Sequence, residues 1–280
     1  MNVMEIRDLC KSYGSFHLDS LNLTLPSGCI MGLVGENGAG KSTTIKLILN
    51  AIRKDRGEIT VFGKDSVKDS LSIKEDVGVV LDEVGFPEYV TVDHVDRMMQ
   101  GIFSHWDSEC FYAYIRRLSV PTDKRFKEFS RGMKMKLGIA VALSHGARLL
   151  ILDEATSGLD PVVRDTVLDI LCEFTRDERN SVLISSHIVS DLEKICDYIA
   201  FLHNGKLMLC KEKDRLKEDY VLVRCKAEEL DTLAKTSLIG KRETPFGVEA
   251  IVRRGAANPS WETGVLDLEQ LFVFMAKEVR

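Results

Sequence analysis

Gly35-Glu36-Asn37-Gly38-Ala39-Gly40-Lys41-Ser42-Thr43 is the stretch that decides the fold of this 280-residue chain. It has two glycines separated by four residues, followed directly by a lysine and a serine. The apolar run before it, residues 29–34, reads as a buried strand, and residues 42–49 after it are compatible with a helix. A strand, a glycine-rich loop and a helix in this order are the context of a phosphate-binding P-loop.

The residue types of this loop suit a phosphate group. Glycine tolerates the unusual dihedral angles that turn backbone N–H groups toward an anion, and the start of the next helix adds unpaired N–H groups and a positive dipole end. Lys41 would reach the β- and γ-phosphates, and the Ser42 hydroxyl would hold Mg²⁺. The alternative is a glycine-rich turn before an ordinary helix. The flanking strand and helix favour ATP or a related nucleotide, bound by all nine residues.

A second motif supplies carboxylates. Residues 149–152 form a short apolar run that is typical of a buried parallel strand, and Asp153 and Glu154 follow it. Ligands of open α/β sheets bind at the carboxyl ends of the strands. We therefore expect Asp153 beside the phosphates as a ligand of Mg²⁺, and Glu154 facing the attacking water as general base. An acidic strand end that caps the next element is the local alternative.

Three further stretches and one aromatic residue resemble the motifs of ATP-binding cassette (ABC) ATPases. Phe129-Ser130-Arg131-Gly132-Met133 is similar to the LSGGQ signature, Ser157-Gly158-Leu159-Asp160 to the D-loop, and Ser185-Ser186-His187 to the H-loop. Tyr13 stands where the family places an aromatic ring against adenine. The stretches follow the order and spacing of the family, and the resemblance covers roughly residues 1–210.

The resemblance implies a role for each of these residues. Ser130 and the N–H groups of Arg131 and Gly132 would contact the γ-phosphate held by a second cassette, and Asp160 would complete that nucleotide site. His187 would bond the γ-phosphate and orient Glu154 and the water. Two ATP molecules would then lie between two cassettes in a self-complementary dimer. A homodimer and a heterodimer with a related subunit both fit.

These residues also have local explanations. Serine often caps a helix, which would account for Ser130. His187 has the alternative of an ordinary, partly buried histidine. Tyrosine at a strand end, as at Tyr13, is common without any ligand.

One position departs from the family. Where the family usually has a glutamine between its core sheet and its helical subdomain, this chain has Asp82. A carboxylate can still bind Mg²⁺ or orient water, so Asp82 is predicted as a catalytic and metal-binding residue. It also adds negative charge beside a triphosphate, which is costly in a partly desolvated site. We expect Asp82 to leave ATP binding largely intact and to alter hydrolysis or coupling to a partner.

The signature departs from the family as well. Arg131 and Met133 replace its usual glycine and glutamine. Arg131 either adds a cation near the phosphates or faces solvent, and the sequence does not decide between them.

Other P-loop proteins fit the sequence less well. Residues 82–85 match the DxxG pattern of GTPases, but no NKxD motif for guanine follows them. A small-molecule kinase needs neither a signature helix nor a histidine after the third apolar strand.

Composition indicates a protein of the cytosol. The net charge of −5 and the isoelectric point near 5.8 predict no basic face and no nucleic-acid partner. Seven cysteines lack metal-ligand spacing, which is typical of reduced thiols. The N-terminus does not resemble a signal peptide, and no apolar run approaches the roughly 20 residues that span a bilayer. We therefore expect a cytoplasmic protein that docks on a separate integral membrane subunit, peripheral to the inner face of the cell membrane.

The expected fold class is α/β, a P-loop NTPase core with a mixed or parallel sheet. An inserted helical subdomain is expected at about residues 86–145, within an ATP-binding domain of residues 1–212. A small α/β appendage, residues 213–280, would follow a charge run at 211–215. Strands are predicted at 58–62, 182–184, 220–225 and 247–253, and helices at 92–103, 108–118, 131–143 and 266–277.

The predicted function is that of the ATP-binding and ATP-hydrolysing subunit of an ABC transporter. Residues 266–272 resemble the tail of bacterial type-2 exporter ATPases, which favours export over import or regulation. One alternative is an ABC ATPase that acts on ribosomes or DNA, but those relatives usually carry two cassettes or a long coiled coil. A regulatory ATP-binding module is the other alternative, and Glu154 disfavours it.

Overall fold

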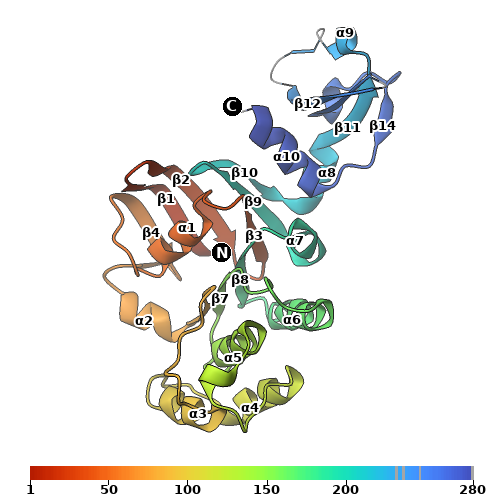
Figure 1. Ribbon diagram of the computed structural model, residues 1–280. Coiled ribbons are helices and arrows are strands. Elements are labelled where there is room, and N and C mark those ends of the chain that lie inside the picture. The colour runs from red at the N-terminus through yellow and green to blue at the C-terminus, as the bar shows by residue number, and fades with distance from the viewer. Residues whose placement is uncertain (231–232, 235–236, 246, 279–280) are drawn as a thin grey trace.

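A computed structural model describes residues 1–230, 233–234, 237–245 and 247–278. At its centre lies a six-stranded sheet in the order β10-β9-β3-β8-β7-β6 (Figure 1). Five of these strands are parallel, and β10 joins one edge antiparallel to β9. The strands are β3 (Ile30–Val34), β6 (Val77–Val80), β7 (Leu149–Asp153), β8 (Ser181–Ser186), β9 (Tyr198–His203) and β10 (Lys206–Glu212). The predicted α/β fold with a mixed sheet is confirmed.

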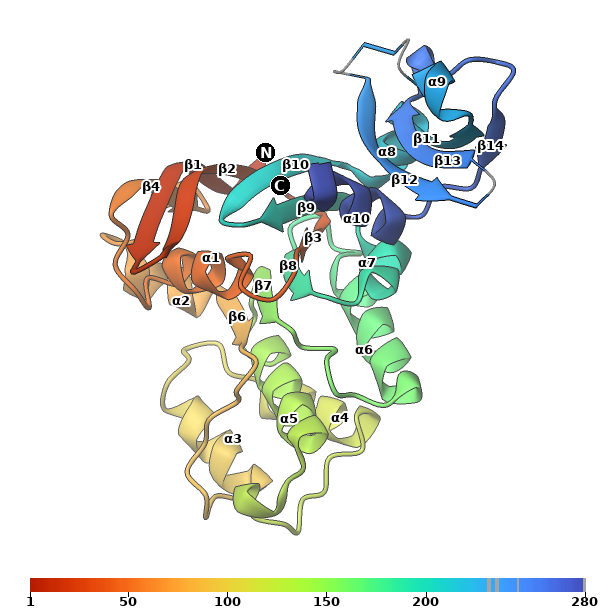
Figure 2. The same ribbon diagram turned by 45° about the horizontal axis from the view of Figure 1, so that its top comes forward.

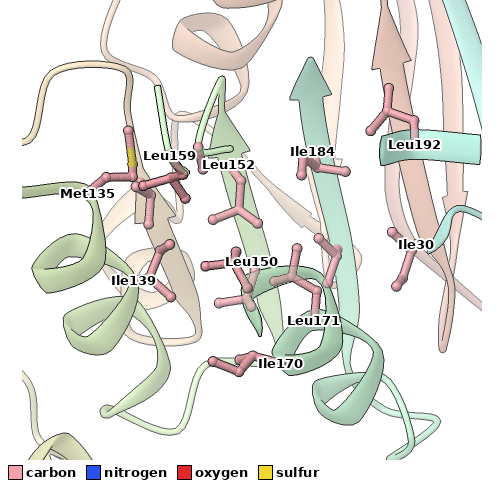
Figure 3. Packing of buried hydrophobic residues seen from close by; sticks show 14 of the residues in the cluster. Ile30, Met135, Ile139, Leu150, Leu152, Leu159, Ile170, Leu171, Ile184 and Leu192 are labelled. Carbon is pink, nitrogen blue, oxygen red and sulfur yellow. The ribbon is translucent and has the colours of Figure 1, made fainter. Parts of the chain in front are cut away.

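The central strands are continuous apolar runs, and successive residues of a strand point to opposite faces of the sheet. Both faces of this sheet are therefore apolar. One face, which carries Leu150 and Ile184, packs against three helices (Figure 3). These helices are α5 (Arg131–Leu143), α6 (Pro161–Phe174) and α7 (Val189–Ile195).

The opposite face, which carries Ile151 and Leu183, packs against α1 (Lys41–Ile48) and a second sheet. That sheet is antiparallel, in the order β2-β1-β4-β5. Its strands are β1 (Asn2–Tyr13), β2 (Phe16–Pro26), β4 (Arg56–Val61) and β5 (Lys64–Asp65). Because β3, β7 and β8 are parallel neighbours, their carboxyl ends meet at one edge of the central sheet.

Between β6 and β7 the chain is helical. After α2 (Ser70–Glu75) and β6 come α3 (Val92–Gln100), α4 (Ser108–Arg117), the 3₁₀ turn η1 (Phe126–Glu128) and α5. These helices lie together at the β6 side of the central sheet (Figures 1 and 2). The helix α5 has the predicted bounds, whereas α3 ends three residues before its predicted end at Phe103. Gly101 follows its last residue and caps it.

A third sheet follows β10. It is antiparallel, in the order β12-β13-β11-β14. Its elements are α8 (Lys213–Asp219), β11 (Tyr220–Cys225), α9 (Ala227–Leu230), β12 (Leu238–Thr244), β13 (Gly247–Arg253), η2 (Arg254–Ala256) and β14 (Glu262–Gly264). The charge run at 211–215 is not a loop, because β10 ends at Glu212 and α8 begins at the next residue. Lys213 Nζ donates to the Glu193 carbonyl, 2.8 Å away.

The helix α10 (Leu268–Glu278) returns from the third sheet to the central one. Leu268, Leu271 and Phe272 belong to the same apolar cluster as the helix-covered face of the central sheet. The Phe272 ring stacks on Phe201 of β9, with ring centroids 4.6 Å apart and planes at 18°. Figure 2 shows α10 above β9 and close to α7. The last helix is therefore packed onto the central sheet.

Candidate functional site

A cavity of about 620 Å³ opens where the carboxyl ends of β3, β7 and β8 meet. Most of the predicted site residues line it: Tyr13, Glu36, Asn37, Gly38, Gly40, Lys41, Ser42, Thr43, Asp82, Arg131, Glu154 and His187. Phe16 and Ser157 line it as well, although neither is among the predicted site residues. Ser157 begins the stretch that resembles the D-loop, whereas Phe16 stands outside every motif. Residues from six separate stretches of the chain therefore converge on one cavity.

The P-loop has the conformation that its glycines allow. Gly38 and Gly40 have positive φ values of 83° and 111°, in the region that other residues rarely adopt. Gly35 is required for a different reason, since a Cβ there would lie 2.4 Å from the Leu202 carbonyl oxygen. Ala39 is buried beneath the loop. The helix α1 begins at Lys41, so its first unpaired N–H groups belong to the loop that lines the cavity.

Lys41 is buried, and its ammonium group is held at the base of the loop. Its Nζ donates to the carbonyl oxygens of Gly35, at 2.7 Å, and Glu36, at 3.3 Å. The same Nζ lies 3.5 Å from Glu154 Oε1. The P-loop cation and the predicted general base are therefore ion-pair partners, and a phosphate that enters here meets both.

Glu154 lies between two groups that can carry positive charge. Its Oε2 is 2.6 Å from His187 Nδ1, on the side opposite Lys41. Its backbone is in the left-handed region, with φ of 53°, which is uncommon for a residue other than glycine. The Glu154 N–H donates to the carbonyl of Ser185, at 3.1 Å, which fixes this conformation. A carboxylate held in this way can take a proton from a water in the cavity.

Asp153 is the last residue of β7 and is buried. Its Oδ1 accepts a hydrogen bond of 2.5 Å from Ser185 Oγ. The two residues are register partners in the parallel pair of β7 and β8. Sequence reasoning did not assign Ser185, although its place at the end of the next strand was a usable signal. A carboxylate here and the Ser42 hydroxyl in the cavity are hard oxygen donors of the kind that Mg²⁺ prefers.

Asp82 follows β6 and faces the same cavity. Arg131 Nη2 donates to Asp82 Oδ1, and the two side chains form an ion pair. Both are about half exposed. Of the two alternatives for Arg131, the structure favours a cation at the cavity, although the side chain is also partly exposed to solvent. The predicted roles of Asp82 in catalysis and metal binding stay predictions.

Ser130, Gly132 and Asp160 are not among the residues that line the cavity, and they stand at the starts of two helices. Ser130 caps α5, since its Oγ accepts from the Met133 N–H at 3.3 Å, and Asp160 caps α6 through the Val163 N–H at 3.0 Å. The local explanation of Ser130 as a cap is thus correct. A Cβ on Gly132 would lie 3.6 Å from Leu159 Cδ2, so the signature abuts the stretch that ends at Asp160.

Two aromatic residues close one side of the cavity. Tyr13 and Phe16 face each other across the turn that joins β1 to β2. The Phe16 ring lies next to the P-loop, because a Cβ on Gly40 would be 3.0 Å from Phe16 Cζ. Lys11 Nζ lies 4.9 Å from the centroid of the Tyr13 ring. The sequence signal for Phe16 was its position opposite Tyr13 in the hairpin of β1 and β2.

A second cavity, of about 210 Å³, adjoins the first. Glu36 and His187 line both cavities. The far wall of the second one is α10, through residues that include Phe272 and Glu269. Beneath it His203, which is buried, has its Nδ1 2.9 Å from Glu36 Oε1. The helix after the third sheet is thus separated from the P-loop by one small cavity.

The described part of the chain carries neither a cluster of metal-binding side chains nor a membrane-spanning helix. No group of three or more His, Cys, Asp or Glu side chains there is arranged to hold a metal ion. Within the same residues, no helix is both long enough and apolar enough to cross a membrane.

Comparison with known proteins gives consistent matches. A family model for ABC transporters matches residues 18–157. The chain is 35% identical over 220 residues to a bacitracin transport ATP-binding protein of Bacillus licheniformis, covering 77% of this chain and 72% of that protein. It is 35% identical over 220 residues to a lantibiotic transport ATP-binding protein of Streptococcus pyogenes, covering 76% and 92%. A solved ATP-binding subunit of an ABC transporter matches with a TM-score of 0.68 at 25% identity, covering 77% of this chain and 92% of that one.

Proposed function

The chain belongs to the ABC transporter family of ATP-binding proteins, and from this premise we propose how its residues divide the work. It binds ATP and is an ATPase that powers transport. The proposal concerns which residues hold the nucleotide, which residues cleave it, and what the subunit assembles with.

The triphosphate is held by the P-loop, Gly35–Thr43. The Lys41 ammonium bonds two loop carbonyls, and both bonds are exchangeable for bonds to phosphate oxygens. The N–H groups at the start of α1 and the glycine-rich turn present further donors to an anion. Tyr13 and Phe16, at the other side of the cavity, offer ring faces to the adenine.

Glu154 acts as general base and His187 orients it. The water is deprotonated by the Glu154 carboxylate as it attacks the γ-phosphate, and ADP and phosphate leave. The ion pair with Lys41 and the hydrogen bond with His187, on either side, keep the carboxylate in one rotamer. The His187 side chain is half exposed, so it reaches the mouth of the cavity, where a γ-phosphate would lie.

Ser42 and Asp153 are proposed as ligands of Mg²⁺, with Asp82 as a third candidate. A bound Mg²⁺ would neutralise phosphate charge and so support the departure of ADP. Ser185 holds the Asp153 carboxylate from below, which is the usual support for a metal ligand. These assignments rest on the donor types and on their positions, with Ser42 at the start of α1, Asp153 at the end of β7 and Asp82 just after β6.

A second cassette would complete the site. Ser130 and Gly132 of a partner would cover the γ-phosphate that this chain holds, as the motifs of the family imply. Asp160, which caps the neighbouring helix, would lie at the same contact. A two-fold arrangement with two shared ATP molecules, in a homodimer or with a related subunit, follows from this self-complementarity.

The subunit is proposed to work at the inner face of the cell membrane, docked on a separate membrane-spanning protein. Two relatives are named for the transport of bacitracin and of lantibiotics, which supports export as the direction. We also propose that residues 1–212 form the ATP-binding domain, with a helical subdomain at about 86–145, and that residues 213–280 form a small extension.

The observation that carries the catalytic proposal is the placement of Glu154 between His187 Nδ1, at 2.6 Å, and Lys41 Nζ, at 3.5 Å. Glu154→Gln keeps the shape and removes the base. We expect ATP turnover to fall by about 10³-fold while Mg·ATP still binds, and the protein to form an ATP-dependent dimer when its mass is measured in solution. Glu109→Gln, at an exposed position of α4, is the control. Turnover near the parental value in Glu154→Gln would refute the assignment.

A further inference from the structure

Two departures from the motifs of the family meet in space. Asp82 replaces the usual glutamine after β6, and Arg131 replaces a glycine of the signature, 49 residues later in the chain. Their side chains form an ion pair, in which Arg131 Nη2 donates to Asp82 Oδ1. Both residues line the nucleotide cavity.

An Asp82 carboxylate without a nearby cation would weaken the binding of a triphosphate in this cavity. The strands β6 and β7 are parallel, with Val80 opposite Leu152, so Asp82 and Glu154 each lie two residues beyond a paired position at the same sheet edge. Both carboxylates face the cavity that receives a triphosphate. Like charges at close range repel strongly where water is partly excluded. A cation beside Asp82 removes most of that cost.

An Arg131 guanidinium without a nearby carboxylate would also be unfavourable, because of its position at a helix N-terminus. It is the first residue of α5, and the first turn of this helix contains no acidic residue. The N-terminus of a helix carries partial positive charge, which favours anions and disfavours cations. Lys134, one turn further on, adds to the positive charge. The Asp82 carboxylate supplies the negative charge that this helix end lacks.

We propose that Asp82 and Arg131 act as one charge-compensated link between the β6 strand end and the signature helix. In this link Arg131 is a positioning residue, which allows Asp82 to stand beside the triphosphate. The inference rests on the proposed function of the cavity. Because both side chains are about half exposed, the pair adds little to the stability of the fold. Its effect is instead on the affinity for ATP.

A double-mutant cycle tests the link. KM and kcat for Mg·ATP are measured on Arg131→Gln, Asp82→Asn and the double variant. Arg131→Gln leaves an unpaired carboxylate, and we expect KM to rise about tenfold with kcat changed less. In the Asp82→Asn background no carboxylate remains to be compensated, so adding Arg131→Gln changes KM by at most about twofold. An equal rise of KM in both backgrounds overturns the proposal.

Two variants separate this link from a general effect of charge. Arg131→Lys keeps the cation, and we expect KM within about threefold of the parent. Lys134→Gln removes the same charge from the same helix, but its Nζ lies over the Phe126 ring, 4.7 Å from the centroid. We expect KM within about twofold of the parent for Lys134→Gln. A rise equal to that of Arg131→Gln also overturns the link.

The parent and Glu154→Gln distinguish failure of the link from failure of the proposed function. A parent without ATPase activity refutes the function itself, whereas an active parent with additive effects in the cycle refutes only the link. Thermal unfolding of each variant is recorded as well. If Arg131→Gln does not fold, Arg131→Met, which also removes the cation and keeps a long side chain, replaces it in the cycle with Asp82→Asn. Coupling of KM in that second cycle supports the link, and strict additivity overturns it.

Discussion

His187 Nδ1 lies 2.6 Å from Glu154 Oε2, and the histidine is the more exposed member of the pair. The carboxylate is mostly enclosed, while the imidazole stands at the open side of the cavity. With the carboxylate as acceptor, Nδ1 donates, and Nε2 is not engaged by Glu154. In the proposed mechanism Nδ1 fixes the base, and Nε2 needs a proton of its own to donate to a γ-phosphate oxygen.

His187→Ala should lower kcat for ATP by about 10²- to 10³-fold, because Glu154 loses the group that holds its orientation. KM should change by less than about threefold, since Lys41 and the loop amides still bind the triphosphate. Steady-state ATPase kinetics measure both constants. His105→Ala, at an exposed position outside the cavity, should behave as the parent. A large rise in KM with an unchanged kcat would show that His187 serves binding and not the chemical step.

Ser185→Ala should weaken the response to Mg²⁺. Its hydroxyl donates to Asp153 Oδ1 at 2.5 Å, and loss of such a support for a metal ligand typically costs 10- to 100-fold in metal affinity. ATPase activity titrated with MgCl₂ gives the half-saturating concentration. Ser181→Ala is the matched control, because Ser181 lies at the other end of β8 and bonds the Gly28 N–H instead. The same shift in both variants would mean that only the strand had been perturbed.

His145 should make the protein less stable in mild acid. The ring is buried and stacks on Phe103, with centroids 4.0 Å apart. Burial lowers the pKa of His145, against smaller opposing effects from its bond to the Val141 carbonyl and from other groups. The unfolded chain, with the ordinary pKa near 6.5, then binds the proton more readily than the folded one.

The stability that follows from a neutral His145 is therefore present above about pH 6.5 and is lost as the pH falls through that value. For one proton the slope is at most about 1.4 kcal/mol per pH unit. Urea unfolding between pH 8 and pH 5 measures it, and His145→Leu should show a shallower fall than the parent. Parallel curves for the two proteins would contradict this explanation.

Phe272→Ala should destabilise the contact of α10 with the central sheet. Phe272 and Phe201 are both buried and their rings are stacked, so the truncation removes apolar contacts and leaves a cavity. Such changes cost about 3 kcal/mol or more of unfolding free energy. Chemical denaturation followed by tryptophan fluorescence gives the value. Val273→Ala, at the partly exposed next position, should cost less than about 1 kcal/mol, and an equal loss would argue against the stack.

The parts of the site that sequence predicts well are those whose chemistry is local. The P-loop can be predicted from nine consecutive residues. Its glycines, lysine and serine meet backbone and phosphate-binding requirements that arise within this short stretch of chain. The helix α5 has its predicted bounds for the same reason, since Ser130 caps it through a neighbour three residues away. Asp153 and Glu154 were predicted from the buried strand that precedes them.

Other contacts depend on how distant segments are brought together. The bond from Ser185 to Asp153 requires the pairing of β7 with β8, and the pair of Asp82 with Arg131 requires α5 to lie over the end of β6. Phe16 enters the cavity only because a hairpin turns it back beside Tyr13. The roles in nucleotide binding, catalysis and dimer contact that sequence assigned to these residues stay predictions.

The return of α10 to β9 also has a bearing on how the protein is made. This helix is synthesised after every element that it packs against, so on the ribosome the Phe201 face of the nascent P-loop fold has no cover. A newly synthesised chain therefore passes through a stage in which this apolar surface is exposed to chaperones and to neighbouring chains. The stacking of Phe272 on Phe201 ends that stage, because it buries the surface.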